Sequence, residues 1–267
     1  MSGLWGVAWA FFLRDLGRVR PWVWIAEWFN AGLLVVFWYF LTRFVQVPSS
    51  FRAAHSEDYF TFSLIGLSFA QYVWRGFSVF VNRVKQERAS GSLEPLWVTA
   101  YPFPLLVLFS GTWIFFASTI DAAVVLVMGK FLGASLGWSG MAQVLGVGLL
   151  TSWAMGALGL LTASWIIAFG QGDVFRPLLN QVIPLFSGAF FPIALFPGWL
   201  RGVAQWMPTT HALVIARGVL SGMESADALR AWVALVGLTV GLSLVGWAVL
   251  TLAIRQARIN GRLAAVL

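Results

Sequence analysis

Charged side chains are scarce in this chain of 267 residues: 10% are Asp, Glu, Lys or Arg, whereas 60% are hydrophobic. A soluble domain usually carries about 25% charged residues. With so few polar side chains, a globule of this size could not cover its own surface in water. The composition therefore excludes an ordinary soluble protein and indicates that lipid surrounds most of the chain.

Cysteine is absent, and the chain has two histidines, His55 and His211. Disulfides and thiolate metal sites are therefore excluded, and a zinc site is not expected from two histidines alone. A phosphate-binding loop is also missing, because "MGKF" has Phe131 where Ser or Thr is required and Val124 where the first glycine belongs. We predict no metal and no cofactor on this chain, and ATP hydrolysis only on a separate partner.

Long apolar runs dominate what is present, and a helix needs about 20 such residues to cross a membrane. Six stretches meet this length, at about 22–41, 59–81, 103–128, 141–169, 177–195 and 231–254. The segment between the last two is apolar but interrupted by prolines and arginines, which predicts re-entrant half-helices on the outer side. With no repeat or linker in view, we predict an all-α fold and a single transmembrane domain over 1–267.

Basic residues set the predicted orientation. The flanks expected to be cytoplasmic hold Arg14, Arg18, Arg20, Arg83, Lys85, Arg88, Arg176, Arg255, Arg258 and Arg262, as the positive-inside rule requires if both termini are cytoplasmic. The anionic inner leaflet then accounts for the net charge of +7 without a nucleic-acid partner. Residues 1–20 are apolar first and basic last, which predicts an interfacial helix and no cleavable signal peptide.

Three charged residues fall inside predicted spans, where a charge is costly and often functional. Glu27 and Arg75 lie at similar depths near the inner ends of the first two spans, so we expect them to pair. Their role, structural or in a transport path, stays open. Asp121 lies closer to the outer end of the third span, where it could meet Arg217 or Lys130 or reach water.

The predicted fifth span is partly polar, with Asn180 and Gln181, and Pro184 is expected to kink it. A kinked polar helix that leads into an aromatic re-entrant segment fits a permeation path, and it fits ordinary helix packing equally well. Two glycine pairs, Gly156/Gly159 and Gly237/Gly241, mark possible close helix contacts.

Two serine motifs raise an enzymatic alternative. "GASLG" (133–137) matches a nucleophile elbow, but it falls in a loop rather than between a strand and a helix. "GWSG" (137–140) resembles the rhomboid protease motif and would make Ser139 a nucleophile. A serine nucleophile needs a base within hydrogen-bond reach, and the sixth span has no histidine, so the protease remains a minor alternative.

The polar break between the second and third spans resembles a known signature. "QERASGSLEPL" (86–96) is similar to the cytoplasmic E-R-x-x-G-[ST]-L-E-x-L signature of type-2 ABC-exporter permeases. "FSGAFFPIALFPGWLRGVAQWMPTTHALVIARGVLSG" (186–222) resembles the segment that follows span five in that family. Together with the predicted spans, the resemblance covers nearly the whole chain. Pro95 and Trp97 depart from the usual pattern, which leaves the length of the signature helix open.

The resemblance implies a multi-pass permease in the cytoplasmic membrane of a prokaryote. It would pair with a second permease chain, identical or related, and dock two ATPase subunits that bind ATP and Mg²⁺. Docking would use a coupling helix formed by Glu87, Arg88, Gly91, Ser92, Leu93, Glu94 and Leu96. The path or outer gate would include Asn180, Gln181, Phe190, Phe191, Pro192, Pro197 and Trp199.

The expected cargo is an amphipathic or hydrophobic drug, lipid or peptide. A permease for lipid-linked polysaccharide is the alternative, although "FLRDLGRVRPWVWIAEW" (12–28) matches the start of such permeases only in part. An ATPase-independent channel would have no need of the coupling signature. Copurification with an ATP-binding protein discriminates between these readings.

Overall fold

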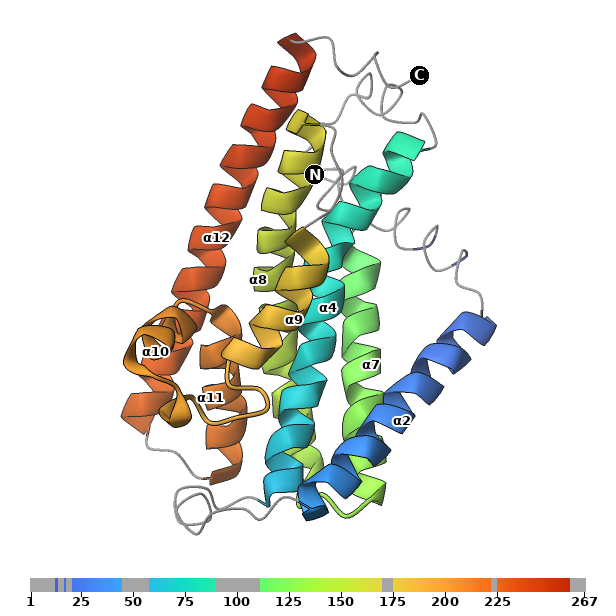
Figure 1. Ribbon diagram of the computed structural model, residues 1–267, viewed down its shortest axis with the longest axis vertical. Coiled ribbons are helices and arrows are strands. Elements are labelled where there is room, and N and C mark those ends of the chain that lie inside the picture. The colour runs from blue at the N-terminus through green and yellow to red at the C-terminus, as the bar shows by residue number, and fades with distance from the viewer. Residues whose placement is uncertain are drawn as a thin grey trace.

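The computed structural model describes residues 13, 17, 21–44, 58–89, 111–169, 175–221 and 225–259, and these form helices and turns without any strand (Figure 1). The predicted all-α class is therefore confirmed for the described part of the chain. The helices are α2 (Pro21–Phe44), α4 (Tyr59–Ala89), α7 (Thr112–Phe131), α8 (Trp138–Phe169), α9 (Phe175–Phe186), η1 (Ile193–Leu195), α10 (Gly198–Gln205), α11 (Pro208–Ser221) and α12 (Ser225–Ile259).

Five of these helices, α2, α4, α7, α8 and α12, are long and apolar enough to cross a membrane. They coincide with five of the predicted spans, although α4 and α12 each continue several residues beyond the predicted ends. The described part of α7 begins at Thr112, so residues 103–110 of the predicted third span lie outside the described residues. The chain is therefore a multi-pass membrane protein.

The prediction of one continuous helix over 177–195 is wrong. Helix α9 has 12 residues and ends at Phe186, so it is about 18 Å long, against a hydrocarbon core of about 30 Å. Pro184 lies inside α9, where its missing N–H leaves the Asn180 carbonyl oxygen without its helical partner. Gly188 then adopts a φ of +84°, a left-handed conformation that favours glycine and ends helices.

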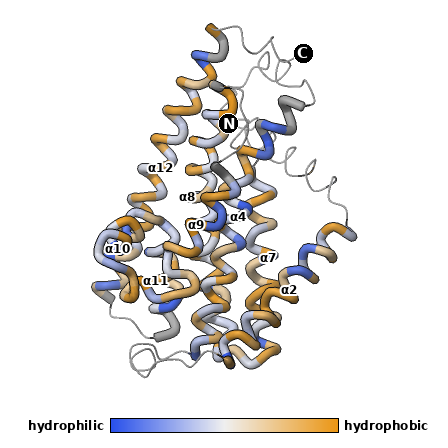
Figure 2. The backbone as a smooth tube through the Cα atoms, viewed as in Figure 1, coloured by the Kyte–Doolittle hydropathy of each residue, from blue (hydrophilic) through white to orange (hydrophobic). Residues whose placement is uncertain are grey.

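Helix α4 occupies the centre of the bundle and contacts α2, α7, α8, α9 and α11. Most of it is buried, whereas most of α2 and α12 is exposed on the outside of the chain. Hydrophilic segments interrupt α4 and α2 (Figure 2). Because neighbouring helices rather than lipid surround α4, its polar side chains can be hydrogen-bonded inside the protein.

Two glycines let backbones approach α4 closely. A Cβ added to Gly159 of α8 would lie 2.4 Å from the carbonyl oxygen of Phe77, and one added to Gly66 of α4 would lie 1.9 Å from that of Ala189. The predicted close helix contact is thus confirmed at Gly159, whereas a Cβ added to Gly156 would meet the rings of Phe115 and Phe80. Within the described chain, an added Cβ at Gly237 or Gly241 meets nothing within 4 Å, so this pair makes no contact with another helix of the same chain.

The helices run in alternating directions, so their ends gather at two poles (Figure 1). The C-terminal ends of α4, α8 and α12 lie at the upper pole, which is the side predicted to be cytoplasmic. Helices α10 and α11 lie in the lower half, beside the start of α12. The segment after α9 therefore lies in the half of the molecule opposite the C-terminal end of α4 (Figure 1).

Candidate functional site

A polar face on α4 faces a cavity of about 430 Å³ between α2, α4, α7 and α9. Its side chains are Gln71, Arg75, Ser78 and Asn82, at a spacing that places them on one side of a helix. Ser78 is buried, Gln71 and Arg75 are half-buried, and Asn82 is exposed. Lipid would not solvate these groups, so they belong against neighbouring helices or the cavity.

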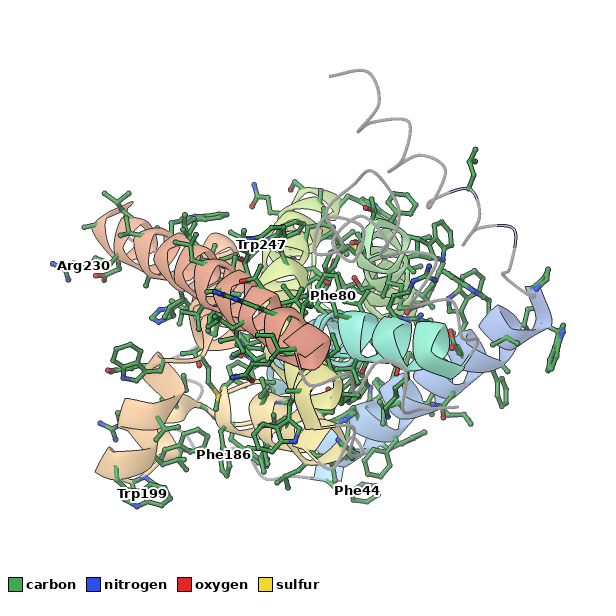
Figure 3. The ribbon with its side chains drawn as sticks, turned by 90° about the horizontal axis from the view of Figure 1, so that it is seen from above. Phe44, Phe80, Phe186, Trp199, Arg230 and Trp247 are labelled. Carbon is green, nitrogen blue, oxygen red and sulfur yellow. The ribbon has the colours of Figure 1, made fainter. Side chains whose placement is uncertain are left out.

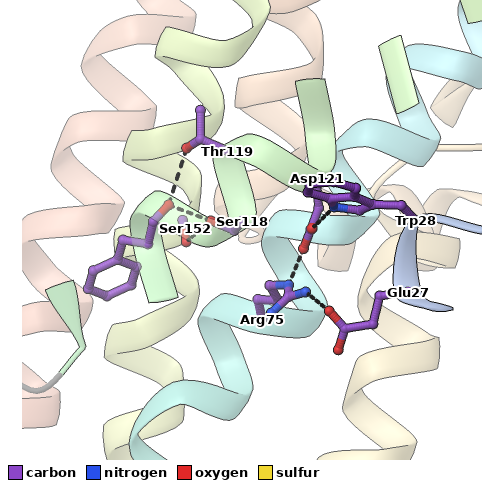
Figure 4. A network of polar contacts seen from close by, with 8 residues as sticks. Glu27, Trp28, Arg75, Ser118, Thr119, Asp121 and Ser152 are labelled. Carbon is purple, nitrogen blue, oxygen red and sulfur yellow. Dashed lines mark hydrogen bonds and ion pairs between the residues drawn. The ribbon is translucent and has the colours of Figure 1, made fainter. Parts of the chain in front are cut away.

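The centre of the cavity holds an ionic network that joins three helices (Figure 4). Arg75 Nη2 of α4 donates a hydrogen bond of 2.5 Å to Glu27 Oε2 of α2, and Arg75 Nε forms an ion pair with Asp121 Oδ2 of α7. The indole Nε1 of Trp28 donates to Asp121 Oδ1 at 3.2 Å. The predicted contact between Glu27 and Arg75 is confirmed.

The expected partners of Asp121 are wrong. Lys130 donates to the carbonyl oxygen of Leu136 at 2.6 Å, and Arg217 points to backbone carbonyls at the other side of α4. Helix α7 continues to Phe131, so Asp121 lies near the middle of its described length rather than toward its outer end. At that depth Asp121 faces Arg75 of α4.

The two carboxylates of the network differ in how deeply their side chains are buried. The side chain of Asp121 is 5% exposed and that of Glu27 is 46% exposed. Asp121 is thus held inside the bundle, whereas Glu27 stands on the open side of the cavity. Among the described residues, no three His, Cys, Asp or Glu side chains come together as a metal site would require.

Helix α9 closes one side of the cavity through Asn180. The indole of Trp74 donates to the carbonyl oxygen of Asn180 at 2.9 Å, and the amide Nδ2 of Asn180 donates to Ser78 Oγ at 3.4 Å. The two polar residues predicted for the path therefore differ in position. Asn180 lines the cavity, whereas the neighbouring Gln181 is exposed and does not line it.

Helix α11 holds the turn that follows α9. Arg217 donates to the carbonyl oxygens of Gly188 at 2.9 Å, Ala189 at 2.8 Å and Phe62 at 3.1 Å, and its guanidinium lies 3.4 Å from the centroid of the Phe62 ring. Thr210 Oγ1 donates to the carbonyl oxygen of Ser187 at 3.2 Å. Three of these bonds pair carbonyl oxygens of the turn itself, where no helical ladder satisfies them.

The residues expected to form an outer gate have different environments. Phe190 stacks on Trp38 of α2, and its carbonyl oxygen accepts a bond from the Tyr59 hydroxyl. Phe191 is exposed. Pro192 and Pro197 precede η1 and α10, and Trp199 lies exposed at the periphery when the molecule is seen from above (Figure 3). Their gating role stays a prediction.

The predicted coupling residues lie at the edge of the described structure. Glu87 and Arg88 fall in the last turn of α4, without a described side chain. Gly91, Ser92, Leu93, Glu94 and Leu96 lie outside the described residues. Helix α4 runs unbroken from the cavity to Ala89, which precedes these residues in the sequence.

The serine motifs have structural partners. Ser135 Oγ lies 3.2 Å from Thr61 Oγ1, and the Ser135 amide donates to the same oxygen at 3.1 Å, so "GASLG" anchors a loop to α4. Ser139 is exposed in the first turn of α8. The ring Nε2 of His211 lies 2.8 Å from the carbonyl oxygen of Gln205. None of these described contacts links a serine to a histidine base.

Sequence reasoning missed Gln71, Ser78 and Asn82, although a signal for them was present. Together with Arg75 they repeat with helical periodicity, but each is unremarkable alone. Only their common direction toward α2, α7 and α9 makes them a site.

Comparison with known proteins gives one family. The family described as ABC-2 type transporter matches residues 20–221, well over half of the chain. The match contains α2, α4, the ionic network and the Arg217 contacts in one continuous stretch. No curated protein matches the chain. The chain therefore belongs to the ABC-2 type transporter family, as a membrane component of a transporter.

Proposed function

We propose that this protein is the membrane-spanning permease of an ATP-driven exporter that moves an amphipathic or hydrophobic substrate. It works in the cytoplasmic membrane with both termini in the cytoplasm, as a dimer with an identical or related chain. The membership of residues 20–221 in the ABC-2 type transporter family carries this proposal.

The energy comes from a partner. The sequence has no phosphate-binding loop, so ATP and Mg²⁺ belong to two ATPase subunits. A partner can change the conformation of the permease only by contacting its two states differently. We assign that contact to the coupling element between Glu87 and Leu96.

Helix α4 supports this assignment. Its 31 residues make a rod of about 45 Å, which is longer than the hydrocarbon core of about 30 Å. Arg75 and Glu87 are twelve residues apart on this rod, so about 18 Å of continuous helix joins the cavity to the coupling element. A displacement of the element would move the polar face of α4 against α2, α7 and α9.

The cavity beside α4 is the proposed position of the substrate. Polar groups beside aromatic rings suit a molecule with both a polar and an apolar part. Trp28 and Trp74 supply the rings, and Gln71, Ser78 and Asn82 supply polar groups. Movement of α4 would change the shape of this cavity directly.

The test uses the purified permease reconstituted with its ATPase. Glu94→Arg should abolish stimulation of the ATPase by substrate, because the reversed charge disrupts docking, while the permease still folds and migrates as a single species. Asp227→Arg makes the same charge change on an exposed residue at the start of α12 and should leave stimulation intact. Wild-type stimulation in the Glu94→Arg protein would exclude this coupling element.

A further inference from the structure

The lining of the cavity has unequal charges. Its described residues include two carboxylates, Glu27 and Asp121, and one guanidinium, Arg75. When all three are ionised, one negative charge is left without a positive partner in the cavity. An uncompensated charge at this depth is costly in a membrane, and a bound cation would balance it.

The geometry disfavours an anion. Arg75 already directs Nη2 to Glu27 and Nε to Asp121, so its charge is matched by two carboxylates that would repel an approaching anion. The carboxylates have remaining capacity, because an ionised carboxylate has about four acceptor positions. Among the described contacts, Glu27 receives one hydrogen bond, from Arg75, and nearly half of its side chain is exposed.

The neighbouring side chains also suit a cation. Trp28 and Trp74 line the cavity, and the Trp24 ring already lies 5.6 Å from the Arg75 guanidinium. Indole faces attract positive charge. In addition, the buried Oδ1 of Asn180, a residue of the cavity wall, has no hydrogen-bond partner among the described residues.

We propose that this cavity binds the positively charged group of an amphipathic organic cation, with Glu27 as the accessible counter-charge and Asp121 as the buried one. The apolar part of the ligand would lie against the tryptophans. This inference rests on the proposed function, because it names the substrate class of the same cavity. It concerns binding alone and involves no reaction.

The experiment measures binding of radiolabelled tetraphenylphosphonium to the purified full-length protein in nanodiscs without ATP. Tetraphenylborate, which has nearly the same shape and the opposite charge, is the matched ligand. We expect saturable binding of the cation and none of the anion. Glu27→Gln should weaken cation binding about tenfold, and Glu27→Asp should retain most of it. Asp227→Asn, which removes an exposed carboxylate outside the cavity, should change nothing.

Two results would overturn the inference. The first is an unchanged dissociation constant in a folded Glu27→Gln protein, which would make the pair with Arg75 purely structural. The second is saturable tetraphenylborate binding that Arg75→Gln removes, which would make the cavity an anion site. Because the measurement needs neither ATP nor an ATPase, its failure is distinguishable from failure of the coupling test with Glu94→Arg.

Discussion

Phe190, which follows the turn after α9, stacks on Trp38 of α2 with ring centroids 4.7 Å apart and an angle of 5° between the planes. Helix α2 is largely exposed, so this pair is one of its anchors to the bundle. The segment after α9 thus has a structural contact at one of the positions expected to form a gate.

Replacing Phe190 should therefore loosen α2. Phe190→Ala removes the stack and should lower the free energy of unfolding by about 1–2 kcal/mol, since an aromatic pair contributes about 0.5–1.5 kcal/mol beyond the area it buries. Thermal unfolding of the purified protein in detergent measures the change. Phe191→Ala is the matched control, because its side chain is 44% exposed. Equal effects of the two substitutions would contradict the anchoring role.

Arg217 should not be replaceable by lysine. Its planar guanidinium reaches the carbonyl oxygens of Gly188, Ala189 and Phe62 together, whereas an ammonium is a point charge without this fork. Arg217→Lys should cost about 1.5–3 kcal/mol, the value of one hydrogen bond to a charged group. Protease sensitivity of the 187–197 segment and the midpoint of thermal unfolding would both report the loss.

The control for this substitution is Arg230→Lys. Arg230 is exposed and forms an ion pair with Asp227 at 3.4 Å, and surface pairs contribute about 0–1 kcal/mol. If Arg217→Lys is as mild as Arg230→Lys, the turn after α9 does not depend on the guanidinium fork.

Gly66 should tolerate no side chain. An added Cβ would lie 1.9 Å from the carbonyl oxygen of Ala189, so Gly66→Ala must push the turn away from α4. We expect a lower yield of monodisperse protein and a lower unfolding temperature. Gly146→Ala of α8 is the control, since nothing lies within 4 Å of the added Cβ there and alanine favours a helix by about 1 kcal/mol. An unaffected Gly66→Ala protein would contradict the close packing.

The ionic network should respond unequally to substitution. Arg75→Gln leaves both Glu27 and Asp121 without their cation and should destabilise the protein by about 3–5 kcal/mol, as removal of one partner from a buried ion pair does. Glu27→Gln should cost less, because Arg75 keeps Asp121 and Glu27 is partly exposed. Unfolding midpoints of the two variants and of the double variant would measure the coupling. An equal cost for both single variants would contradict the shared role of Arg75.

Much of this architecture can be predicted from short stretches of the sequence. Continuous apolar length predicts α2, α8 and α12, and similar depths in two neighbouring spans predict the contact between Glu27 and Arg75. Such inferences succeed because the bilayer fixes the length of a span, so the position of a residue along the span gives its depth in the membrane.

The end of α9 and the partners of Asp121 depend on tertiary contacts, which could not be predicted from the sequence. The run 177–195 is apolar enough for a span, but α9 ends at Phe186, before the left-handed Gly188. Arg217 and Thr210 of α11 supply the bonds that make the turn stable. No residue close to the turn in the sequence indicates that Arg217 and Thr210 would donate these bonds. Asp121 was assigned wrong partners for a similar reason, because its depth depends on where α7 ends and its neighbour depends on how α7 is rotated about its axis.

We propose that ATP hydrolysis on a partner moves substrate through the cavity beside α4. ATP-dependent export from proteoliposomes that contain the permease and its ATPase tests this most directly, with the compound that stimulates the ATPase most as cargo. The wild type should export with ATP, whereas Glu94→Arg and Asn82→Leu, which changes a cavity residue, should not. Wild-type export by both variants, or the same flux without ATP, would exclude ATP-driven transport through this cavity.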